Sequence, residues 1–470
     1  MQSQEFRTLS KKLKDNLSRL MEKRSNWESH WQEVSDLMLP RKAEITKERA
    51  RGDKRNTQIF DATAIHALEL LAASLHGMLT SSANRWFSLR FKELSLNDND
   101  EAKEWLEDAT ERMYDAIAKS NFQQEIFECY HDLIAFGTAC LLIENDQEDT
   151  LLFSARHIKE VYIQENKKGL VDTIYRRFKM PAQAVANKFG FENLSREIQN
   201  TSQKNPFDEV ELVHVVRPRE DFDPGKEDKQ NMPFESVYFE YNSGHIISIG
   251  GFRENPYVIP RYLKASTEQY GRSPGMNALP DVKVLNKMVE NSLKAAAKQI
   301  DPPLLIPDDG MIAPVRMSPG SINYYRSGSR DRIEPLNINA NTAITLNNEN
   351  QRRDAIAKMF HVDQLLIQEN RNMTATEVLQ RNEEKMRILG PVLGRLQSEL
   401  LSPMIVRIFN IMLRQGLFLQ APEILLKQEL KIEYVSPMAL AQRSQELQSL
   451  MRGLELFGSM SQTMPVMDYI

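Results

Sequence analysis

The sequence has few of the features that mark secreted, membrane or simple DNA-coating proteins. Its 470 residues include two cysteines, Cys129 and Cys140, which cannot form a disulfide framework and fit a reducing compartment. The longest nearly uninterrupted apolar run, Leu133–Ile143, is far shorter than the roughly 20 residues that span a bilayer. Neither sign of charge dominates, because 60 basic residues face 65 acidic ones. We therefore expect a protein without a membrane segment and without an overall cationic surface.

Common catalytic signatures are missing as well. There is no P-loop, no dinucleotide-binding glycine pattern, and no HExxH or CxxC motif. The acidic run 97–101 lacks the glycine and the bidentate glutamate of a calcium loop and precedes a helical pattern, so we interpret it as a helix N-cap. We expect no cofactor, no metal and no enzymatic activity. An enzyme that acts on DNA through an unrecognised site stays an alternative.

The first 273 residues combine helical and strand patterns. Apolar residues recur at threes and fours through 5–39, and Pro40 should end that helix. Further helices are predicted at 61–80 (with Asp61 as the N-cap), 101–119, 121–136 and 181–190. Strands are predicted at 86–91, 141–144, 151–154, 160–164, 170–178, 209–217, 235–241 and 245–252. The strands between 138 and 178 should form a meander, and the whole order predicts an α+β fold.

From 274 onward the pattern is mainly helical. Helices are predicted at 274–300, 343–360 and 374–415, the last capped by Thr374 and Glu377 and kinked at Gly390-Pro391. The proline-rich segment 301–340 between the first two should form short strands and turns. A strand at 430–435 and a helix at 437–457 should follow. Such long helices expose faces that one chain does not cover, which predicts an oligomer.

Two groups of basic residues stand out. Residues 41–55 hold seven basic and three acidic residues, and form either a solvated connector or an anchoring site for a partner or nucleic acid. On the helix 274–300, four lysines fall within an arc of about 60° at 100° per residue. An apolar stripe lies roughly 130° away on the same helix and should pack against neighbours. Its residues are Val282, Leu285, Val289, Leu293, Ala296 and Ile300.

An ordered set of short segments resembles one known family. Near the N-terminus, Trp27 and Trp31 precede Leu39-Pro40, Asp61-Ala62-Thr63-Ala64, Leu71-Ala72-Ala73-Ser74-Leu75 and Trp86-Phe87-Ser88-Leu89. In the middle stand Pro260-Arg261-Tyr262, Tyr270-Gly271-Arg272-Ser273-Pro274-Gly275-Met276, Leu279-Pro280-Asp281 and Leu285-Asn286. Later come Met373-Thr374-Ala375-Thr376-Glu377-Val378, Arg381, Glu384 and Gly390-Pro391. Over about 30–445, this set resembles the head-to-tail connecting, or portal, proteins of short-tailed bacteriophages.

The resemblance implies a ring, commonly of twelve copies, at one vertex of the capsid. Each subunit would have the α+β portal fold with these parts: a wing (1–273), a first stem helix (274–300), a small β clip (301–342), a second stem helix (343–360), a tunnel loop (361–373), a long kinked helix with the wing return (374–436) and the start of a helical crown (437–470). Members of the family usually continue further, so we expect a truncated chain or a short member.

The resemblance also implies sites. If the first stem helix lines the channel, Lys283, Lys287, Lys294 and Lys298 face DNA. Otherwise they form a solvated outer face, paired with Glu290 or with acids of the second stem helix. In the tunnel loop, Gln368, Asn370, Arg371 and Asn372 would face DNA, unless the loop only packs on a neighbouring subunit. In the clip, the docking residues would be Met311, Ile312, Arg316, Tyr324, Tyr325, Arg326, Arg330 and Arg332, unless this is an ordinary solvated loop.

The expected function is therefore that of a channel through which double-stranded DNA is packaged and ejected. The expected partners are DNA, terminase, tail adaptor and other tail proteins, and the major capsid and scaffolding proteins, with no membrane. The expected location is the virion vertex, after assembly in the host cytoplasm. The alternative is a virion or tail scaffold protein that does not contact DNA.

Overall fold

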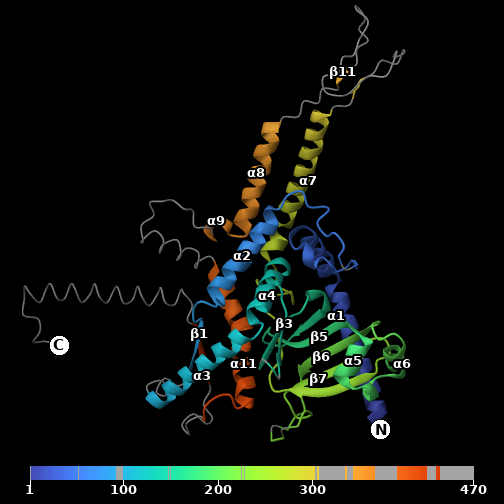
Figure 1. The fold of residues 1–470 in the computed structure, drawn as a ribbon, viewed down its shortest axis with the longest axis vertical. Helices are drawn as coiled ribbons and strands as arrows, with labels where there is room; N and C mark the ends of the chain where they lie inside the picture. The colour runs from blue at the N-terminus through green and yellow to red at the C-terminus, as the bar shows by residue number, and fades with distance from the viewer. Residues whose placement is uncertain are drawn as a thin grey trace, which may run out of the picture.

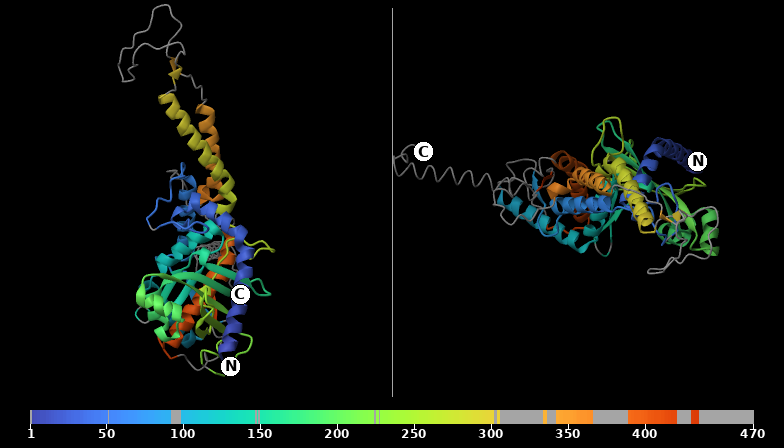
Figure 2. Two further views of the ribbon diagram at one scale, coloured as in Figure 1. Left: turned by 90° about the vertical axis from the view of Figure 1, so that its right-hand side faces the viewer. Right: turned by 90° about the horizontal axis from the view of Figure 1, so that it is seen from above.

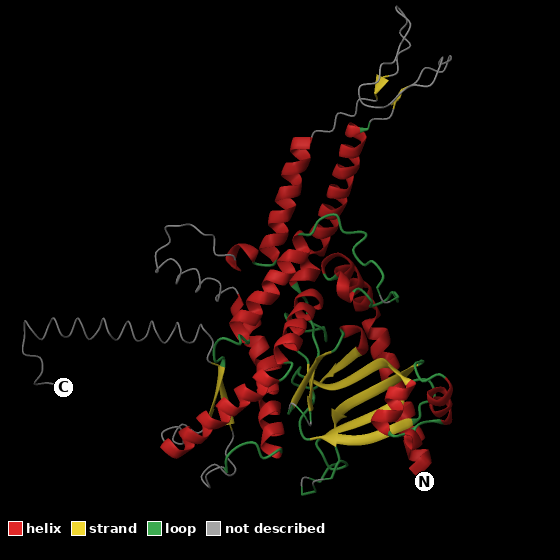
Figure 3. Ribbon diagram, in the orientation of Figure 1, coloured by secondary structure: helices red, strands yellow, loops and turns green. Residues whose placement is uncertain are grey.

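Two long helices project from a body of helices and antiparallel strands (Figure 1). The computed structural model describes residues 2–50, 52–91, 99–146, 148, 150–223, 225–226, 228–301, 304–305, 334–335, 342–365, 389–420 and 430–434. The larger strands lie in the body, and the projecting part is helical up to two short strands at its tip (Figure 3). The structure is a mixed helix-and-sheet fold, which confirms the predicted α+β class.

The elements follow the predicted order. The helices are α1 (Gln2–Met38), α2 (Thr63–Leu79), α3 (Asp100–Lys119), α4 (Phe122–Phe136), α5 (Ala182–Phe189), α6 (Arg196–Lys204), α7 (Pro274–Ile300), α8 (Thr342–Met359), α9 (Val362–Leu365) and α11 (Ser402–Arg414). The strands are β1 (Phe87–Phe91), β2 (Leu141–Asn145), β3 (Leu151–Ala155), β4 (Val161–Glu165), β5 (Val171–Pro181), β6 (Glu209–Pro218), β7 (Phe234–Glu240), β8 (Ile246–Phe252), β9 (Tyr257–Val258), β10 (Leu304–Leu305), β11 (Glu334–Pro335) and β12 (Leu430–Tyr434). None of the described helices is both long and apolar enough to cross a bilayer.

A five-stranded antiparallel sheet in the order β4-β5-β6-β7-β8 forms one side of the body. Leu13, Leu17 and Leu20 of α1 pack on one face of this sheet, against side chains that include Val213 and Val215. The first half of α1 lies along the sheet, and its N-terminal end is far from the tip of the projecting helices (Figure 2). The three- and four-residue spacing of the leucines is what places them on one face of α1.

Part of the other face of the five-stranded sheet is covered by α5 and α6, and the rest packs against the main core. Leu212 of β6 packs there with Val185 of α5 and Ile198 of α6. Because successive side chains of a strand point to opposite faces, Leu212 and Val213 enter different clusters. Both faces of β6 are therefore buried, which explains its nearly continuous apolar sequence.

The predicted meander is wrong at its centre. Strands β2 and β3 pair with each other, and β2 also pairs with β9, so they form a separate three-stranded sheet. Strands β4 and β5 belong to the five-stranded sheet. A further antiparallel pair joins β1 to β12, two strands that lie far apart in the sequence.

Two predictions about helix ends need correction. Ala62, not Asp61, is the N-cap residue of α2, although an Asp61 carboxylate oxygen accepts a hydrogen bond from the Thr63 amide at 2.9 Å. The predicted break at 361–373 begins with the short helix α9. In the predicted long helix, the described part is helical from 389 and contains a π-helical turn, η5 (Gln397–Leu401), beyond the expected kink at Gly390-Pro391. The predicted helix at 437–457 lies outside the described residues.

The basic segment 41–55 folds back on the body. Five of its basic residues form ion pairs with carboxylates of the same chain: Arg41, Lys42, Lys47, Arg49 and Arg55. Because these cations already have partners, the segment fits the connector interpretation better than the anchoring one.

Two glycines let the chain cross itself below α7. Gly137 ends α4 with a φ of 75°, and a Cβ added there would lie 2.2 Å from the carbonyl oxygen of Gly271. A Cβ added to Gly271 would lie 2.1 Å from the carbonyl oxygen of Gly137. The two backbones therefore touch where no side chain fits.

Replacing Gly271 with alanine should destabilise the protein by at least about 2 kcal/mol, because overpacking would force the two backbones apart. Gly77→Ala is the control, since Gly77 lies inside α2 with nothing within 4 Å of an added Cβ. That variant should be neutral or more stable by up to about 1 kcal/mol. Thermal unfolding midpoints compare the two, and equal midpoints would show that the crossing has room for a methyl group.

Candidate functional site: the two-helix arm and its base

The projecting helices α7 and α8, here called the two-helix arm, carry the predicted lysine stripe. Lys283, Lys287, Lys294 and Lys298 are all exposed on α7. Glu290 binds two of them, with Lys287 Nζ at 2.8 Å and Lys294 Nζ at 2.5 Å from its carboxylate oxygens. Hydrogen bonds from these lysines lower the pKa of Glu290 to about 2, so it stays ionised at neutral pH. Lys283 pairs with Glu33 of α1 at 2.6 Å. The stripe is therefore basic but partly neutralised.

The apolar stripe of α7 is covered near the body and uncovered toward the tip. Val282 is 4% exposed and Leu285 is 1% exposed, so the lower part packs as predicted. Farther along α7, Leu293 is 56% exposed and Ile300 is 85% exposed. On the neighbouring helix, Leu346 is 55% exposed. The described residues leave this upper apolar surface, made of Leu293, Ile300 and Leu346, open.

Polar contacts fasten α8 to α7 and to the body. Glu349 is buried and accepts a hydrogen bond from Ser292 Oγ of α7 at 2.6 Å. One turn along α8, Arg353 pairs with Asp61 beside α2 at 2.9 Å. Buried polar groups need such partners, so these contacts specify how the two helices stand against each other.

The other predicted site residues belong to the tunnel loop and the clip. The tunnel-loop residues Gln368, Asn370, Arg371 and Asn372 lie outside the described residues. The same holds for the clip residues Met311, Ile312, Arg316, Tyr324, Tyr325, Arg326, Arg330 and Arg332. Between α7 and α8, the structure describes Asp301 and the short antiparallel pair β10 and β11.

At the base of the arm, motif residues from distant parts of the sequence pack together. Tyr270 lies between two tryptophans of α1, with ring centroids 5.8 Å from Trp27 and 5.2 Å from Trp31. The Trp31 indole donates a hydrogen bond to the carbonyl oxygen of Phe136 at 3.0 Å. Burial raises the pKa of Tyr270 to about 12, so its hydroxyl stays neutral. These contacts join α1, the end of α4 and the start of α7.

Ser273 starts the arm. Its hydroxyl accepts a hydrogen bond from the Met276 amide at 3.0 Å and donates one to the carbonyl oxygen of Ala135 at 2.8 Å. Pro274 occupies the first helical turn, where a missing N–H has no cost. The segment Gly271–Gly275 fits the G-x-S-x-G pattern of hydrolase nucleophiles, so the expectation that common catalytic signatures are missing is wrong for this motif. Because Ser273 is fully buried and its oxygen is used for capping, it serves as a structural cap.

The buried Arg261 connects the base of the arm to the C-terminal helical segment. Its Nε and Nη2 donate to the two carboxylate oxygens of Glu399 at 3.0 and 2.8 Å. Nη2 also donates to the carbonyl oxygen of Gly169 at 2.9 Å, and Nη1 binds Glu165. Burial alone would lower the pKa of Arg261, but Glu399 and Glu165 raise it above its ordinary value.

The ion pair between Arg261 and Glu399 was not predicted from the sequence. Pro260-Arg261-Tyr262 follows the apolar strand β9, so an arginine in an apolar run was the available signal for a buried cation. Its partner could not be identified, because Glu399 lies 138 residues away in the sequence. Glu399 belongs to the π-helical turn η5, and such turns often occur where a helix carries a functional constraint.

The side chains at the base of the two-helix arm make structural contacts that position the arm. Within the described ranges, no three His, Cys, Asp or Glu side chains converge as a metal site would require. Burial raises the pKa of the Cys140 thiol to about 12, and it also raises that of Cys129, so neither is poised as a nucleophile. The contacts at the base tie the start of the arm to α1, α4 and the C-terminal helical segment.

Glu399→Gln should destabilise the protein by roughly 3 kcal/mol, because it removes the main charge partner of a buried arginine. The control is Asp108→Asn, which removes an exposed pair with Arg112 on α3. That change should cost less than about 0.5 kcal/mol. Denaturant unfolding measures both, and a Glu399→Gln variant as stable as the control would contradict the central place of this ion pair.

Comparison with known proteins identifies the family. The family model for the bacteriophage head to tail connecting protein matches residues 10–470. The portal protein of Salmonella phage epsilon15 is 33% identical over 97% of this chain and 84% of its own length. The probable portal protein of Bordetella phage BPP-1 is 32% identical over 97% of this chain and 84% of its own length. Among solved structures, a chain from a native gene transfer agent virion aligns at 10% identity over 83% of this chain and 84% of that one, with a TM-score of 0.41, too low to bear on the fold. On the family match and the two phage relatives, the chain belongs to the bacteriophage head to tail connecting protein family.

Proposed function

We propose that this protein is a portal: a ring of identical subunits at one capsid vertex, through which double-stranded DNA enters and leaves. Support comes from the two portal proteins that match 97% of the chain at 32–33% identity. In this proposal α7 and α8 are the two stem helices, and the segment between them is the clip. Terminase and later the tail adaptor would dock at the clip, and the tunnel loop would contact DNA.

The observation that best supports a ring is the exposed upper apolar surface of the arm. Leu293, Ile300 and Leu346 are more than half exposed on a pair of helices that project from the body. Removing one such side chain from water stabilises by roughly 1.5–3 kcal/mol. Side-by-side packing of neighbouring arms would cover this surface in every subunit at once, because a ring repeats the same contact.

The lysine stripe supports a channel that guides DNA and does not grip it. Exposed lysines attract phosphates as mobile point charges. Glu290 lies between Lys287 and Lys294 and neutralises part of their charge. With a net charge of −5 per chain, a ring would not wrap DNA, and tight binding would slow its passage. We therefore infer that the stripe faces the ring axis.

Electron microscopy of the purified protein tests the proposal. Negatively stained particles should be rings with an open centre wide enough for duplex DNA. Solid or filamentous assemblies would favour a scaffold protein that does not contact DNA, and monomers at all concentrations would contradict the ring.

Charge variants of the stripe test the DNA-facing role. Changing the four lysines to glutamine should weaken the salt dependence of DNA packaging in vitro, since fewer phosphates are neutralised. Glu290→Gln should change it in the opposite direction, because it releases two lysines from their partner. Lys103→Gln on α3 is the control, and Lys103 is also exposed. Identical salt dependence in all variants would remove the stripe from the DNA path.

A further inference from the structure

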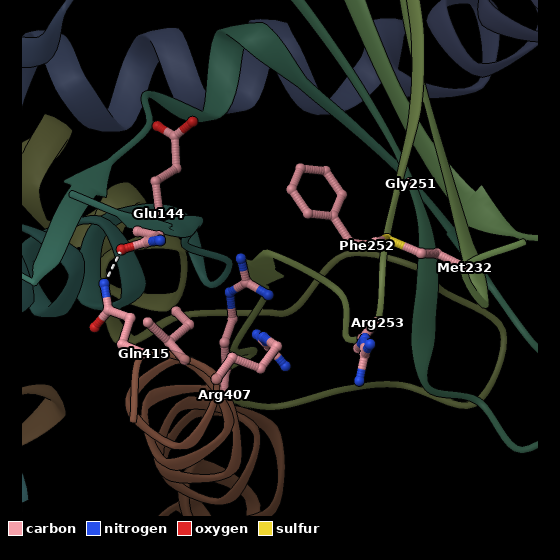
Figure 4. Close-up of a pocket in the computed structure, with 10 residues that line it drawn as sticks. Glu144, Met232, Gly251, Phe252, Arg253, Arg407 and Gln415 are labelled. Carbon is pink, nitrogen blue, oxygen red and sulfur yellow. Dashed lines mark hydrogen bonds between the residues drawn. The ribbon is translucent and has the colours of Figure 1, made fainter. Parts of the chain in front are cut away.

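A cavity of about 470 Å³ lies in the body, away from the arm. It is bordered by α11, by β2 of the three-stranded sheet and by the end of β8 of the five-stranded sheet. Its lining comes from β2 and the segment at the end of β8 on one side and from α11 on the other. Figure 4 shows Glu144, Phe252 and Arg407 around the opening between these elements. The residues that line it are Glu144, Asn145, Met232, Gly251, Phe252, Arg253, Arg407, Ile411, Arg414 and Gln415.

Arg407 is the central charge of this cavity. It is 4% exposed, and its Nε donates to the carbonyl oxygen of Ile143 at 2.8 Å. Its Nη1 donates to the backbone carbonyl oxygen of Glu254 at 3.2 Å, while the Glu254 carboxylate lies farther away at 3.5 Å. No hydrogen bond from its Nη2 is found within the described part of the chain. A buried guanidinium thus retains donor capacity beside an open cavity.

The Glu254 carboxylate, which lies near Arg407, forms its shorter contacts with another arginine. Arg414 binds Glu254 with both nitrogens, at 2.7 and 3.1 Å. Arg253 also lines the cavity, and Glu144 is the carboxylate among the lining residues. Burial lowers the pKa of Arg407 to about 10 despite the opposing charge of Glu254. The buried Arg261 differs, since its carboxylates raise its pKa. Arg407 thus shares its nearest carboxylate, that of Glu254, with Arg414.

Asn145 and Gln415 add polar side chains to the lining, and another part of it is apolar. Met232, Phe252 and Ile411 form this part, and the Phe252 ring centre lies 5.6 Å from the Arg407 guanidinium carbon. Cavities of a few hundred cubic ångströms with an apolar wall and a few placed polar groups are typical of small-ligand sites.

We propose that this cavity binds a small ligand that carries a phosphate or carboxylate group on an apolar body. The oxyanion would accept hydrogen bonds from Arg407 and Arg414, and the apolar body would lie against Phe252 and Ile411. Planar guanidinium groups bind both oxyanions in the same two-pronged way, so their shared chemistry defines the ligand class. The site does not depend on the ring, because every residue that forms it belongs to one chain.

Saturation-transfer NMR on the full chain tests this binding with phenyl phosphate, benzoate and, as a neutral analogue, benzyl alcohol. Phenyl phosphate or benzoate should bind, and titration should give at least roughly tenfold weaker binding for benzyl alcohol, because it lacks the ionic contact. Whichever anion binds more tightly identifies the oxyanion. Binding of neither anion, or equal binding of all three probes, would overturn the proposal.

Two variants locate the binding. Gln415→Glu adds a negative charge to the lining, and Arg414→Gln removes a positive one. Each variant should weaken binding of the more tightly bound anion by roughly tenfold, because a unit charge at contact distance changes affinity by about that factor. Gln183→Glu adds the same charge on α5, outside the lining, and should leave affinity unchanged. Both lining variants must keep the thermal unfolding midpoint of the unaltered protein. If folded lining variants bind as well as Gln183→Glu, the anion binds elsewhere and the proposal fails.

Discussion

The ion pair between Arg261 and Glu399 is the contact on which the relation of arm and body depends. It joins the segment before α7, the turn after β4 and the C-terminal helical segment through one buried guanidinium. Removing one partner of a buried pair costs several kcal/mol, whereas replacing both can be nearly neutral. We infer that this pair adds specificity more than net stability, because it brings three particular segments to one buried guanidinium.

The direction of the two-helix arm depends on the contacts around the start of α7. The backbone crossing at Gly137 and Gly271 and the cap at Ser273 set the starting point and direction of α7. Contacts from Arg353 and Glu349 then hold α8 beside it. The arm projects far enough that Leu293 and Ile300 leave the body, so its upper apolar surface is available to a second copy of the chain.

The sequence predicted the elements of the fold better than their partners. Periodicity located α1 and α7, because burial of one helix face leaves a regular pattern. It could not show that β2 pairs with β9 or that β1 pairs with β12, since those pairings join distant segments. The lysine stripe was visible for the same reason as the helices, but its ion pair with Glu33 of α1 needed the fold. No pattern in the sequence pointed to the cavity around Arg407, because that cavity forms only where α11 meets two sheets.

Thiol labelling of one introduced cysteine tests most directly whether neighbouring arms cover one another. Cys129 and Cys140 are buried, so Leu293→Cys would supply the reactive thiol. Maleimide should modify position 293 slowly in the assembled protein and rapidly after dissociation. Glu104→Cys on α3, which is exposed, should react rapidly in both forms. Equally rapid modification of position 293 in both forms would contradict the account, because the apolar surface of the arm would then be open in the assembly.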